Sequence, residues 1–150
     1  MPRFSANLSF LFQDVPLLDR IDAAAANGFR GVEFMSPYDD DVAEIKRRLR
    51  AGGMEQALFN LPAGNFAAGE RGYASDPSRV AEFQRGVTNA VKIAHELGCT
   101  RVNCLVGIAI PDLDRALARR TLVSNVRYAA AELATIGATL VVEPLNRIDT

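Results

Sequence analysis

Glu143 is the residue whose surroundings in the sequence most strongly suggest chemistry. It directly follows the apolar run Leu-Val-Val at 140–142 and precedes a proline, so we place it at the carboxyl end of a buried strand. An unpaired carboxylate is costly to bury, and we therefore expect it to be paired, protonated or bound to a metal. Two interpretations stay open: an ion pair with a neighbouring arginine or lysine, and a general base or ligand of Mg²⁺ or Mn²⁺, which favour carboxylate oxygens.

A second group of polar residues lies within or at the end of other predicted strands. Glu33 occurs in GVEFM, and Asn7, Asn60 and Asn103 occur in three further strands. Any one asparagine could bond only to nearby backbone, and Glu33 could be held by a salt bridge. Because the carboxyl ends of barrel strands meet at one face, three asparagines on three strands predict a polar pocket. In that pocket Glu33 would bind a substrate hydroxyl.

The segment PAGNFAAGERG at 62–72 is long for a connection between a strand and a helix. Long ordered loops often act as lids or binding loops. The alternative is a solvated loop of the Ω type. As a lid, the loop would bring Glu70 and Arg71 to the substrate, where the guanidinium group would meet a carboxylate, an interaction that its planar geometry suits.

The histidine, serine and cysteine residues give little support for a catalytic or metal-binding role. His95 is the single histidine and lies mid-helix in KIAHELG, so we interpret it as a surface or packing residue, and no histidine-based triad can be built. No serine lies in a nucleophile elbow. Cys99 and Cys104 show neither a zinc pattern nor a disulfide framework, and we interpret them as reduced apolar residues of a cytoplasmic protein.

Strand-like and helix-like segments alternate along the chain. Glycines close the predicted helices, and the second helix has acidic residues at its start and basic residues at its end, which suits the helix dipole. Strands are predicted at 3–12, 30–35, 54–61, 100–107 and 138–146, and helices at 15–28, 39–53, 78–98 and 112–137. This alternation is typical of a parallel sheet built from strand–helix units.

Two folds compete for that pattern. A doubly wound nucleotide-binding sheet would carry a glycine-rich turn after its first strand, but the turn here reads FLFQDVPL. A TIM barrel needs eight strands and about 250 residues, and its catalytic residues come from the ends of several strands. The distribution of Asn7, Glu33, Asn60, Asn103 and Glu143 favours the barrel.

The composition is that of an ordinary globular protein, with 49% hydrophobic and 23% charged residues in 150. A net charge of −1 gives weak support for nucleic-acid binding. The N-terminus is too short and polar for a signal h-region, and no apolar run reaches the roughly 18 residues of a membrane span. We therefore expect a cytoplasmic protein without a nucleic-acid or membrane partner.

Five segments of the chain form a recognisable set, in this order over essentially its whole length: RFSANLSFLF, GFRGVEFMSPYD, FNLPAGNFAAGERG, VNCLVG and LVVEPLNRID. Together they resemble the hydroxypyruvate isomerase family of the xylose-isomerase-like TIM barrels. The combination of NLPAGxxAAGERG with EPLNR is quite specific. EPLNR is also shared by the isomerases of 2-oxo-tetronates and by the ketose 3-epimerases.

The resemblance implies that 1–150 is the N-terminal portion of a single α/β TIM (β/α)8 barrel. Glu143 would be both a divalent-metal ligand and one of two catalytic carboxylates, and Asp149 would match an acidic residue near the substrate. The family's other metal ligands and its second catalytic glutamate lie on the last three strands, beyond the five predicted here. Phe59 departs from the family, because a histidine is expected before Asn-Leu-Pro. The full set of expected substrate-binding residues is Asn7, Glu33, Asn60, Glu70, Arg71, Asn103, Asn146 and Asp149.

The leading hypothesis is an isomerase that interconverts hydroxypyruvate and tartronate semialdehyde through an enediolate, with Mg²⁺ or Mn²⁺ beside the oxygen that gains charge. Its substrate would be a small hydroxy-oxo acid, and we expect a homo-oligomer. A 2-oxo-tetronate isomerase or ketose 3-epimerase is the alternative within the superfamily. Two further hypotheses are a non-catalytic partial barrel that folds only by associating, and metal-dependent phosphodiester cleavage as in the superfamily's apurinic endonucleases.

Overall fold

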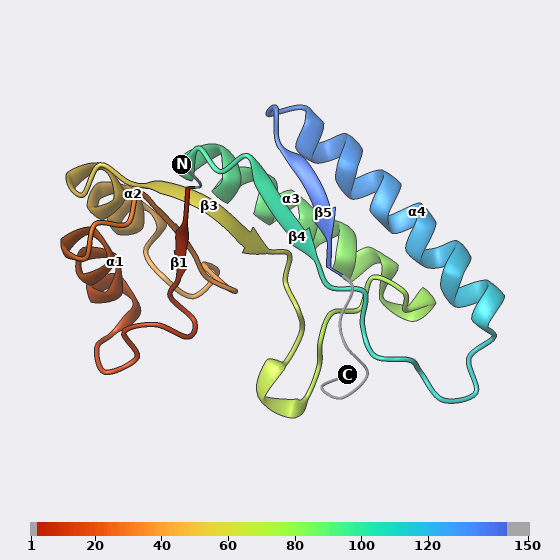
Figure 1. The fold of residues 1–150 in the computed structure, drawn as a ribbon. Coiled ribbons are helices and arrows are strands. Elements are labelled where there is room, and N and C mark those ends of the chain that lie inside the picture. The colour runs from red at the N-terminus through yellow and green to blue at the C-terminus, as the bar shows by residue number, and fades with distance from the viewer. Residues whose placement is uncertain (1–2, 144–150) are drawn as a thin grey trace.

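The computed structural model of the protein describes residues 3–143. Five parallel strands form one sheet, and their order in space follows their order in the sequence (Figure 1). They are β1 (Ser5–Asn7), β2 (Gly31–Glu33), β3 (Glu55–Asn60), β4 (Arg101–Cys104) and β5 (Thr139–Val142). The order predicted for a barrel is thereby confirmed, because a doubly wound sheet would place its first strand in the interior.

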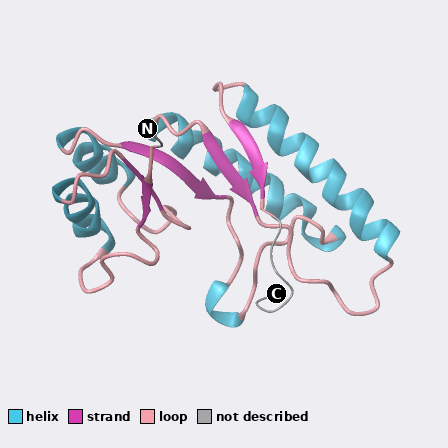
Figure 2. Ribbon diagram, in the orientation of Figure 1, coloured by secondary structure: helices cyan, strands magenta, loops and turns pink. Residues whose placement is uncertain are grey.

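A helix follows each of the first four strands. They are α1 (Leu17–Ala26), α2 (Val42–Ala51), α3 (Val80–Leu97) and α4 (Arg115–Ala134), with two short 3₁₀ turns, η1 (Phe66–Ala68) and η2 (Pro77–Arg79), before α3. Each helix packs against the next along the outer face of the curved sheet, and the connections after the strands leave from one edge (Figure 2). This is the arrangement of consecutive strand–helix units in a barrel.

The helix ends follow from local chemistry. Asp41 caps α2 by accepting hydrogen bonds from the backbone N–H groups of Ala43 and Glu44, at 3.0 and 3.2 Å. Asp114 caps α4 in the same way. Gly98 ends α3 with a φ of 66°, a left-handed conformation that glycine adopts without strain. The predicted helices are therefore all present, each trimmed by a few residues at its ends.

The strands are shorter than the sequence indicated, most of all the first. A strand was expected over 3–12, but β1 ends at Asn7 because the chain turns there. The backbone carbonyl of Asn7 accepts from the N–H groups of Phe10 and Leu11, at 3.1 and 2.9 Å. The apolar residues 8–12 therefore form a turn at the end of the sheet, which brings Phe10 to the site described below.

Side chains alternate between the two faces of the sheet. The fully buried strand residues Ala6, Val32, Phe59, Val102 and Cys104 belong to the cores between sheet and helices. Successive residues of a strand point to opposite faces. Their neighbours therefore point to the inner face, and these are Asn7, Glu33, Asn60 and Asn103.

A bulge between β2 and β3 sets the orientation of β3. The register of the two strands shifts after Val32, so that Glu33 pairs with Leu58 and Ala57 is an extra residue. A bulge of one residue reverses which side chains face which side. Beyond it, Leu58 and Asn60 lie on the same face as Glu33.

The helices of the described segment are those of a globular fold. Two buried clusters fill the space between sheet and helices, one under α1 and α2 and the other under α3 and α4. Within residues 3–143, no helix combines the length and the apolar character needed to cross a bilayer.

Candidate active site

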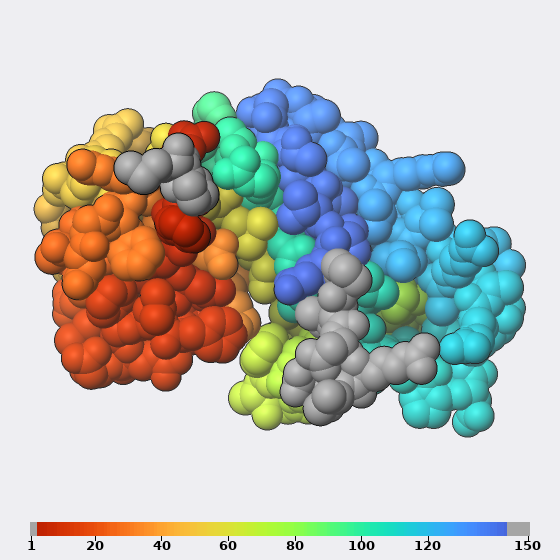
Figure 3. Space-filling model, viewed as in Figure 1, coloured from red at the N-terminus to blue at the C-terminus, as the bar shows by residue number. Residues whose placement is uncertain are grey.

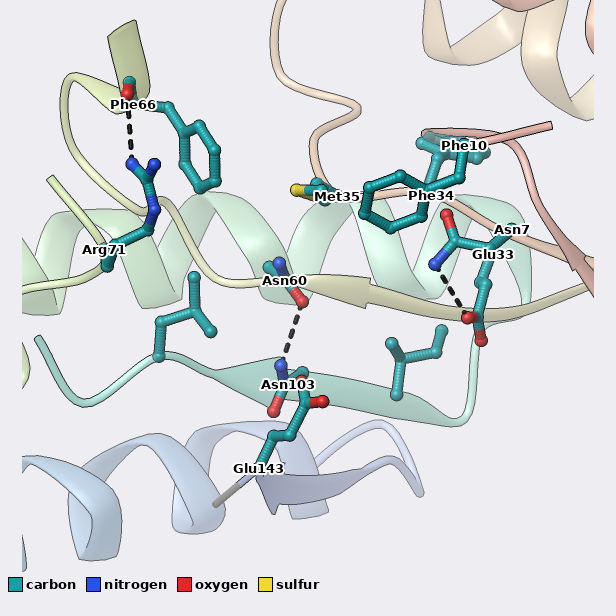
Figure 4. A pocket seen from close by; sticks show the side chains of 12 residues that line it. Asn7, Phe10, Glu33, Phe34, Met35, Asn60, Phe66, Arg71, Asn103 and Glu143 are labelled. Carbon is teal, nitrogen blue, oxygen red and sulfur yellow. Dashed lines mark hydrogen bonds between the residues drawn. The ribbon is translucent and has the colours of Figure 1, made fainter. Parts of the chain in front are cut away.

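A cavity of about 360 Å³ lies at the carboxyl ends of the strands (Figure 4). Three phenylalanines, a methionine and two leucines form its apolar walls. In the space-filling view an indentation separates the turn after β1 from the loop after β3 on this side of the molecule (Figure 3). The structure brings to this cavity six of the residues that the sequence singled out: Asn7, Glu33, Asn60, Arg71, Asn103 and Glu143.

Asn7 and Glu33 form a cross-strand pair. They are register partners on β1 and β2, and Asn7 Nδ2 donates to Glu33 Oε1 at 3.0 Å. The Ser5 hydroxyl donates to the other oxygen, Glu33 Oε2, at 3.3 Å. Within the described chain no lysine or arginine pairs with Glu33, so its carboxylate is held by neutral donors and not by a salt bridge. A half-buried carboxylate with this support keeps acceptor capacity for a ligand.

Asn60 and Asn103 form a second cross-strand pair, on β3 and β4. They are register partners, and Asn103 Nδ2 donates to Asn60 Oδ1 at 3.0 Å. Both side chains are buried, at 8% and 3% exposure. The Tyr38 hydroxyl donates to the backbone carbonyl of Asn60 at 2.7 Å, and its burial raises the pKa of that phenol. Asn103 Oδ1 is buried without a hydrogen-bond partner in the described residues.

Glu143 follows β5 and points to the same face as the amide pair. Val141 is the register partner of Asn103, and Glu143, two residues later, points to the same face of the sheet (Figure 4). Burial of this strand is lower than the sequence suggested, since Val142 is 45% exposed and Glu143 is itself exposed. Within residues 3–143 the Glu143 carboxylate has neither a hydrogen bond nor an ion pair. The ion pair, one of the two interpretations left open, is therefore not seen among the described residues.

The loop after β3 brings Arg71 to the cavity. Its guanidinium carbon lies 3.7 Å from the centre of the Phe66 ring, a stacked cation–π contact. Arg71 Nη1 donates to the backbone carbonyl of Phe66 at 3.1 Å (Figure 4). It also donates to the backbone carbonyl of Glu70 at 2.8 Å. An arginine has five N–H donors, so this anchored group keeps others for a ligand anion.

The base of that loop is fastened to the segment after β4. Gly72 forms an antiparallel bridge with Val106, and the Ser75 N–H donates to the Val106 carbonyl at 3.1 Å. Gly72 has a φ of 94°, and a Cβ there would lie 2.1 Å from the Leu105 carbonyl oxygen. Only glycine fits this close approach of two backbones. The loop is thus fixed at its base and exposes its tip at the cavity.

Glu70 does not line the cavity, although the sequence placed it with the substrate. Its carboxylate accepts hydrogen bonds from the backbone N–H of Asn65 and from the guanidinium group of Arg79. The Asn65 N–H foremost, and then Arg79, lower the pKa of Glu70 below its usual value. The role of Glu70 in this structure is to brace the loop that carries Arg71.

Several features of the site were not foreseen from the sequence. Phe10 lines the cavity from a segment expected to be strand, and the signal for its turn is weak because residues 8–12 are largely apolar. Phe59, where a histidine was expected, is fully buried on the helix side and meets the Tyr38 ring edge-on at 6.2 Å. That departure therefore does not alter the cavity wall. Asn146 and Asp149 lie outside the described residues.

The remaining reactive residues lie away from the cavity. His95 is exposed on α3, as expected of a surface residue. Cys99 and Cys104 are buried free thiols, and burial raises the pKa of Cys104 to about 12. A thiol with such a pKa stays protonated and inert at neutral pH. The site therefore contains carboxylate, amide and guanidinium groups.

A divalent metal ion is not accommodated by the described residues alone. In residues 3–143 no three histidine, cysteine, aspartate or glutamate side chains gather closely enough to hold an ion. Glu143 and Glu33 are the only carboxylates that line the cavity there, and Glu33 is already engaged by Asn7 and Ser5. Mg²⁺ demands several oxygen ligands in near-octahedral geometry, which this part of the chain does not assemble.

The chain and its fold have clear counterparts among known proteins. The 2-oxo-tetronate isomerase of Cupriavidus necator is 45% identical over 149 residues, which are 99% of this chain and 57% of that protein. The hydroxypyruvate isomerase of Escherichia coli K12 is 48% identical over 149 residues, 99% of this chain and 58% of that protein. A crystal structure from Brucella melitensis, named AP endonuclease, family 2, superposes with a TM-score of 0.93 at 47% identity and covers 97% of this chain and 56% of its own.

The chain therefore spans between 56% and 58% of the length of these counterparts. A family model described as the xylose isomerase-like TIM barrel matches residues 21–150. The match agrees with the five parallel strands in sequence order and with a cavity at their carboxyl ends. The chain belongs to the xylose isomerase-like TIM barrel family.

Proposed function

We propose that this chain carries part of the active site of a sugar-acid isomerase that interconverts hydroxypyruvate and tartronate semialdehyde. The observation that carries the proposal is the convergence of Glu143, Asn60, Asn103 and Arg71 on one small cavity. The names of the two isomerase relatives, at 45% and 48% identity, support this reaction class. The isomerisation of a 2-oxo-tetronate, and the 3-epimerisation of a ketose, are alternatives within it.

The reaction moves a proton between two adjacent carbons. A base removes a proton from the carbon that bears the hydroxyl, and the electron pair forms the double bond of an enediolate while the carbonyl oxygen gains the negative charge. The hydroxyl proton passes to that former carbonyl oxygen, and an acid returns a proton to the carbon that had carried the carbonyl. Glu143 would act as that base, and two observations support this role: it lines the cavity, and no other described residue bonds to its carboxylate. General acid–base help of this kind contributes roughly 10²–10⁴-fold to the rate. The Arg71 guanidinium would hold the substrate carboxylate.

We also propose that the complete enzyme binds a divalent metal such as Mg²⁺ or Mn²⁺, with Glu143 as one of its ligands. A carboxylate of this kind is the one ligand that the described segment would contribute, and further ligands would have to come from elsewhere in the assembled protein. A homo-oligomer with a cytoplasmic location is equally proposed. No nucleic-acid or membrane partner is proposed.

The test of the function is the Glu143→Gln substitution, made at the matching position of a full-length relative such as the E. coli enzyme. Glutamine keeps the shape but removes the basicity, so kcat should fall roughly 10²-fold or more. The rate is followed as loss of hydroxypyruvate, with and without Mg²⁺ or Mn²⁺, and circular dichroism checks the fold. The control is a glutamate-to-glutamine substitution at the amino ends of the barrel strands, away from the cavity. An unchanged kcat in a folded protein would disprove the role of Glu143.

The 150-residue chain on its own should be close to inactive in the same assay. Its described part assembles no group of three metal-ligating side chains. Turnover by this chain at rates typical of enzymes, about 1–10³ s⁻¹, would contradict that expectation. The missing groups would then come from a second copy of the chain, or the site would work without them.

Phosphodiester cleavage is a second candidate, because the Brucella structure at 47% identity is named an AP endonuclease. A net charge of −1 and a cavity with a single arginine argue against a polyanionic substrate. Incubation of the full-length E. coli relative with abasic duplex DNA and a divalent metal decides between the two reactions, because the 150-residue chain is expected to be inactive in either. Metal-dependent strand cleavage would favour the endonuclease, and intact DNA would favour the isomerase.

A further inference from the structure

Asn103 Oδ1 is an acceptor left without a donor in the interior of the protein. Asn103 is 3% exposed, and its Oδ1 is one of two buried side-chain atoms in residues 3–143 that lack a hydrogen-bond partner. Such an atom destabilises the fold, because it has lost its bond to water and gained nothing in return. In a native protein it calls for an explanation, and one explanation is a ligand.

The geometry fixes what this atom can do. Asn103 Nδ2 donates to Asn60 Oδ1 at 3.0 Å, so Oδ1 of Asn103 faces away from that bond. Asn103 on β4 is the register partner of Asn60 on β3 and of Val141 on β5. Val141 stands two residues before Glu143 in the chain. All of Asn60, Asn103 and Glu143 line the cavity (Figure 4). A group bound by the amide pair would thus lie next to the proposed base.

The second atom of this kind provides a contrast. Gln56 Oε1 is also buried without a partner, while Gln56 Nε2 donates to the Leu58 carbonyl at 2.8 Å. Gln56 does not line the cavity. Both amide oxygens lack a hydrogen-bond donor, but only that of Asn103 belongs to a residue that lines the cavity.

We propose that Asn103 and Asn60 act as one unit that recognises the hydroxyl group of the substrate. Asn103 Oδ1 would accept the O–H, and Asn60 Nδ2, which no described residue engages, would donate to an adjacent oxygen. An amide oxygen can only accept, so this position binds a hydroxyl more tightly than a carbonyl or a C–H group. The proposal rests on the proposed function and specifies how its substrate is oriented toward Glu143. Asn103 is a positioning residue and takes no part in proton transfer.

The test compares two ligands that differ by the one hydroxyl. Hydroxypyruvate carries it and pyruvate lacks it, while both carry the carboxylate for Arg71. Their dissociation constants are measured on this chain by titration of the asparagine side-chain NH₂ signals in NMR spectra. The wild-type protein should bind hydroxypyruvate about tenfold more tightly than pyruvate or better, the size expected when a buried acceptor is left unpaired.

Two substitutions separate recognition from packing. Asn103→Leu removes the acceptor oxygen but keeps a side chain of similar size. In this variant hydroxypyruvate and pyruvate should bind about equally well. Asn103→Asp keeps an acceptor oxygen, and the Asn60 amide can rotate to donate to it, so this variant should retain the preference. Gln56→Leu, which removes the other unpartnered amide oxygen, should leave the preference unchanged.

Two results would overturn the proposal. One is a hydroxypyruvate preference that survives in Asn103→Leu, and the other is the absence of any shift of the Asn60 and Asn103 signals with millimolar hydroxypyruvate. Thermal denaturation shows that each variant is folded before it is titrated. Either result is distinguishable from failure of the proposed function, which is decided by Glu143→Gln and by isomerase turnover.

Discussion

Phe59 and Asn60 are consecutive residues with opposite surroundings. Phe59 is fully buried against the helices, and Asn60 reaches the cavity. Once Asn60 is assigned to the inner face, the period of two in a strand places its neighbour on the outer face. The sequence could therefore have shown that a phenylalanine at 59 leaves the cavity unaltered. It could not show the partners of the asparagines, because these depend on the register between strands far apart in the chain.

At this scale we expect Phe59→Ala to destabilise the protein without changing the cavity. Removal of a fully buried aromatic ring should lower the free energy of unfolding by about 3–5 kcal/mol. Chemical denaturation followed by circular dichroism measures it. Phe4→Ala is the matched control, because Phe4 is 72% exposed and should change the value by no more than about 0.5 kcal/mol. Equal effects of the two substitutions would contradict the assignment of faces.

The loop after β3 is the element in which expectation and structure differ most. Its length and its glycines indicated a binding loop, and it does bring Arg71 to the cavity. Glu70 was assigned to the substrate as a residue of the expected lid, yet it is bound by Arg79 and by the Asn65 N–H. Sequence alone could not reveal this, because Arg79 lies beyond the loop and meets it only after folding.

The loop should loosen in acid. The pKa of Glu70 is held below its ordinary value of 4.5, so its ionised form stabilises the fold. That stabilisation is complete above pH 4.5 and is lost as the pH falls through the lowered pKa. We expect the hydrogen-exchange protection factor of the Asn65 amide to fall over that acid range. In Glu70→Gln protection should be weaker at neutral pH and insensitive to this titration, and a wild-type profile in that variant would contradict the assignment.

For the molecule as a whole, the described chain leaves one side of its sheet uncovered. The helices cover the outer face, whereas the inner face holds the cavity and no helix of the described segment lies against it (Figure 2). Phe4 beside β1 and Val142 on β5 are 72% and 45% exposed at the two edges of the sheet. The barrel fold was predictable from strand–helix alternation and from the absence of a glycine-rich turn, because both are local patterns. The lengths of the strands were not, since turns at their ends compete with pairing.

Uncovered strand edges with apolar side chains favour association. We expect the 150-residue chain to form oligomers, with a sedimentation coefficient that rises with protein concentration in analytical ultracentrifugation. Val142→Asp places a charge on the exposed edge of β5 and should shift the equilibrium toward the monomer. A protein that stays monomeric at all concentrations would contradict this expectation.

The bulge at Ala57 has a consequence for how insertions and deletions act on this protein. Glu33 pairs with Leu58 because one extra residue stands in β3. Loss of that single residue would restore an unbroken register in which Val32 still pairs with Gln56 and Glu33 with Leu58. Phe59 would stay against the helices, and Asn60 would keep its place opposite Asn103. A one-codon deletion at this place would therefore preserve both faces of β3, whereas the same deletion within β4, which pairs with β5 without a bulge, would exchange the faces of every strand residue beyond it.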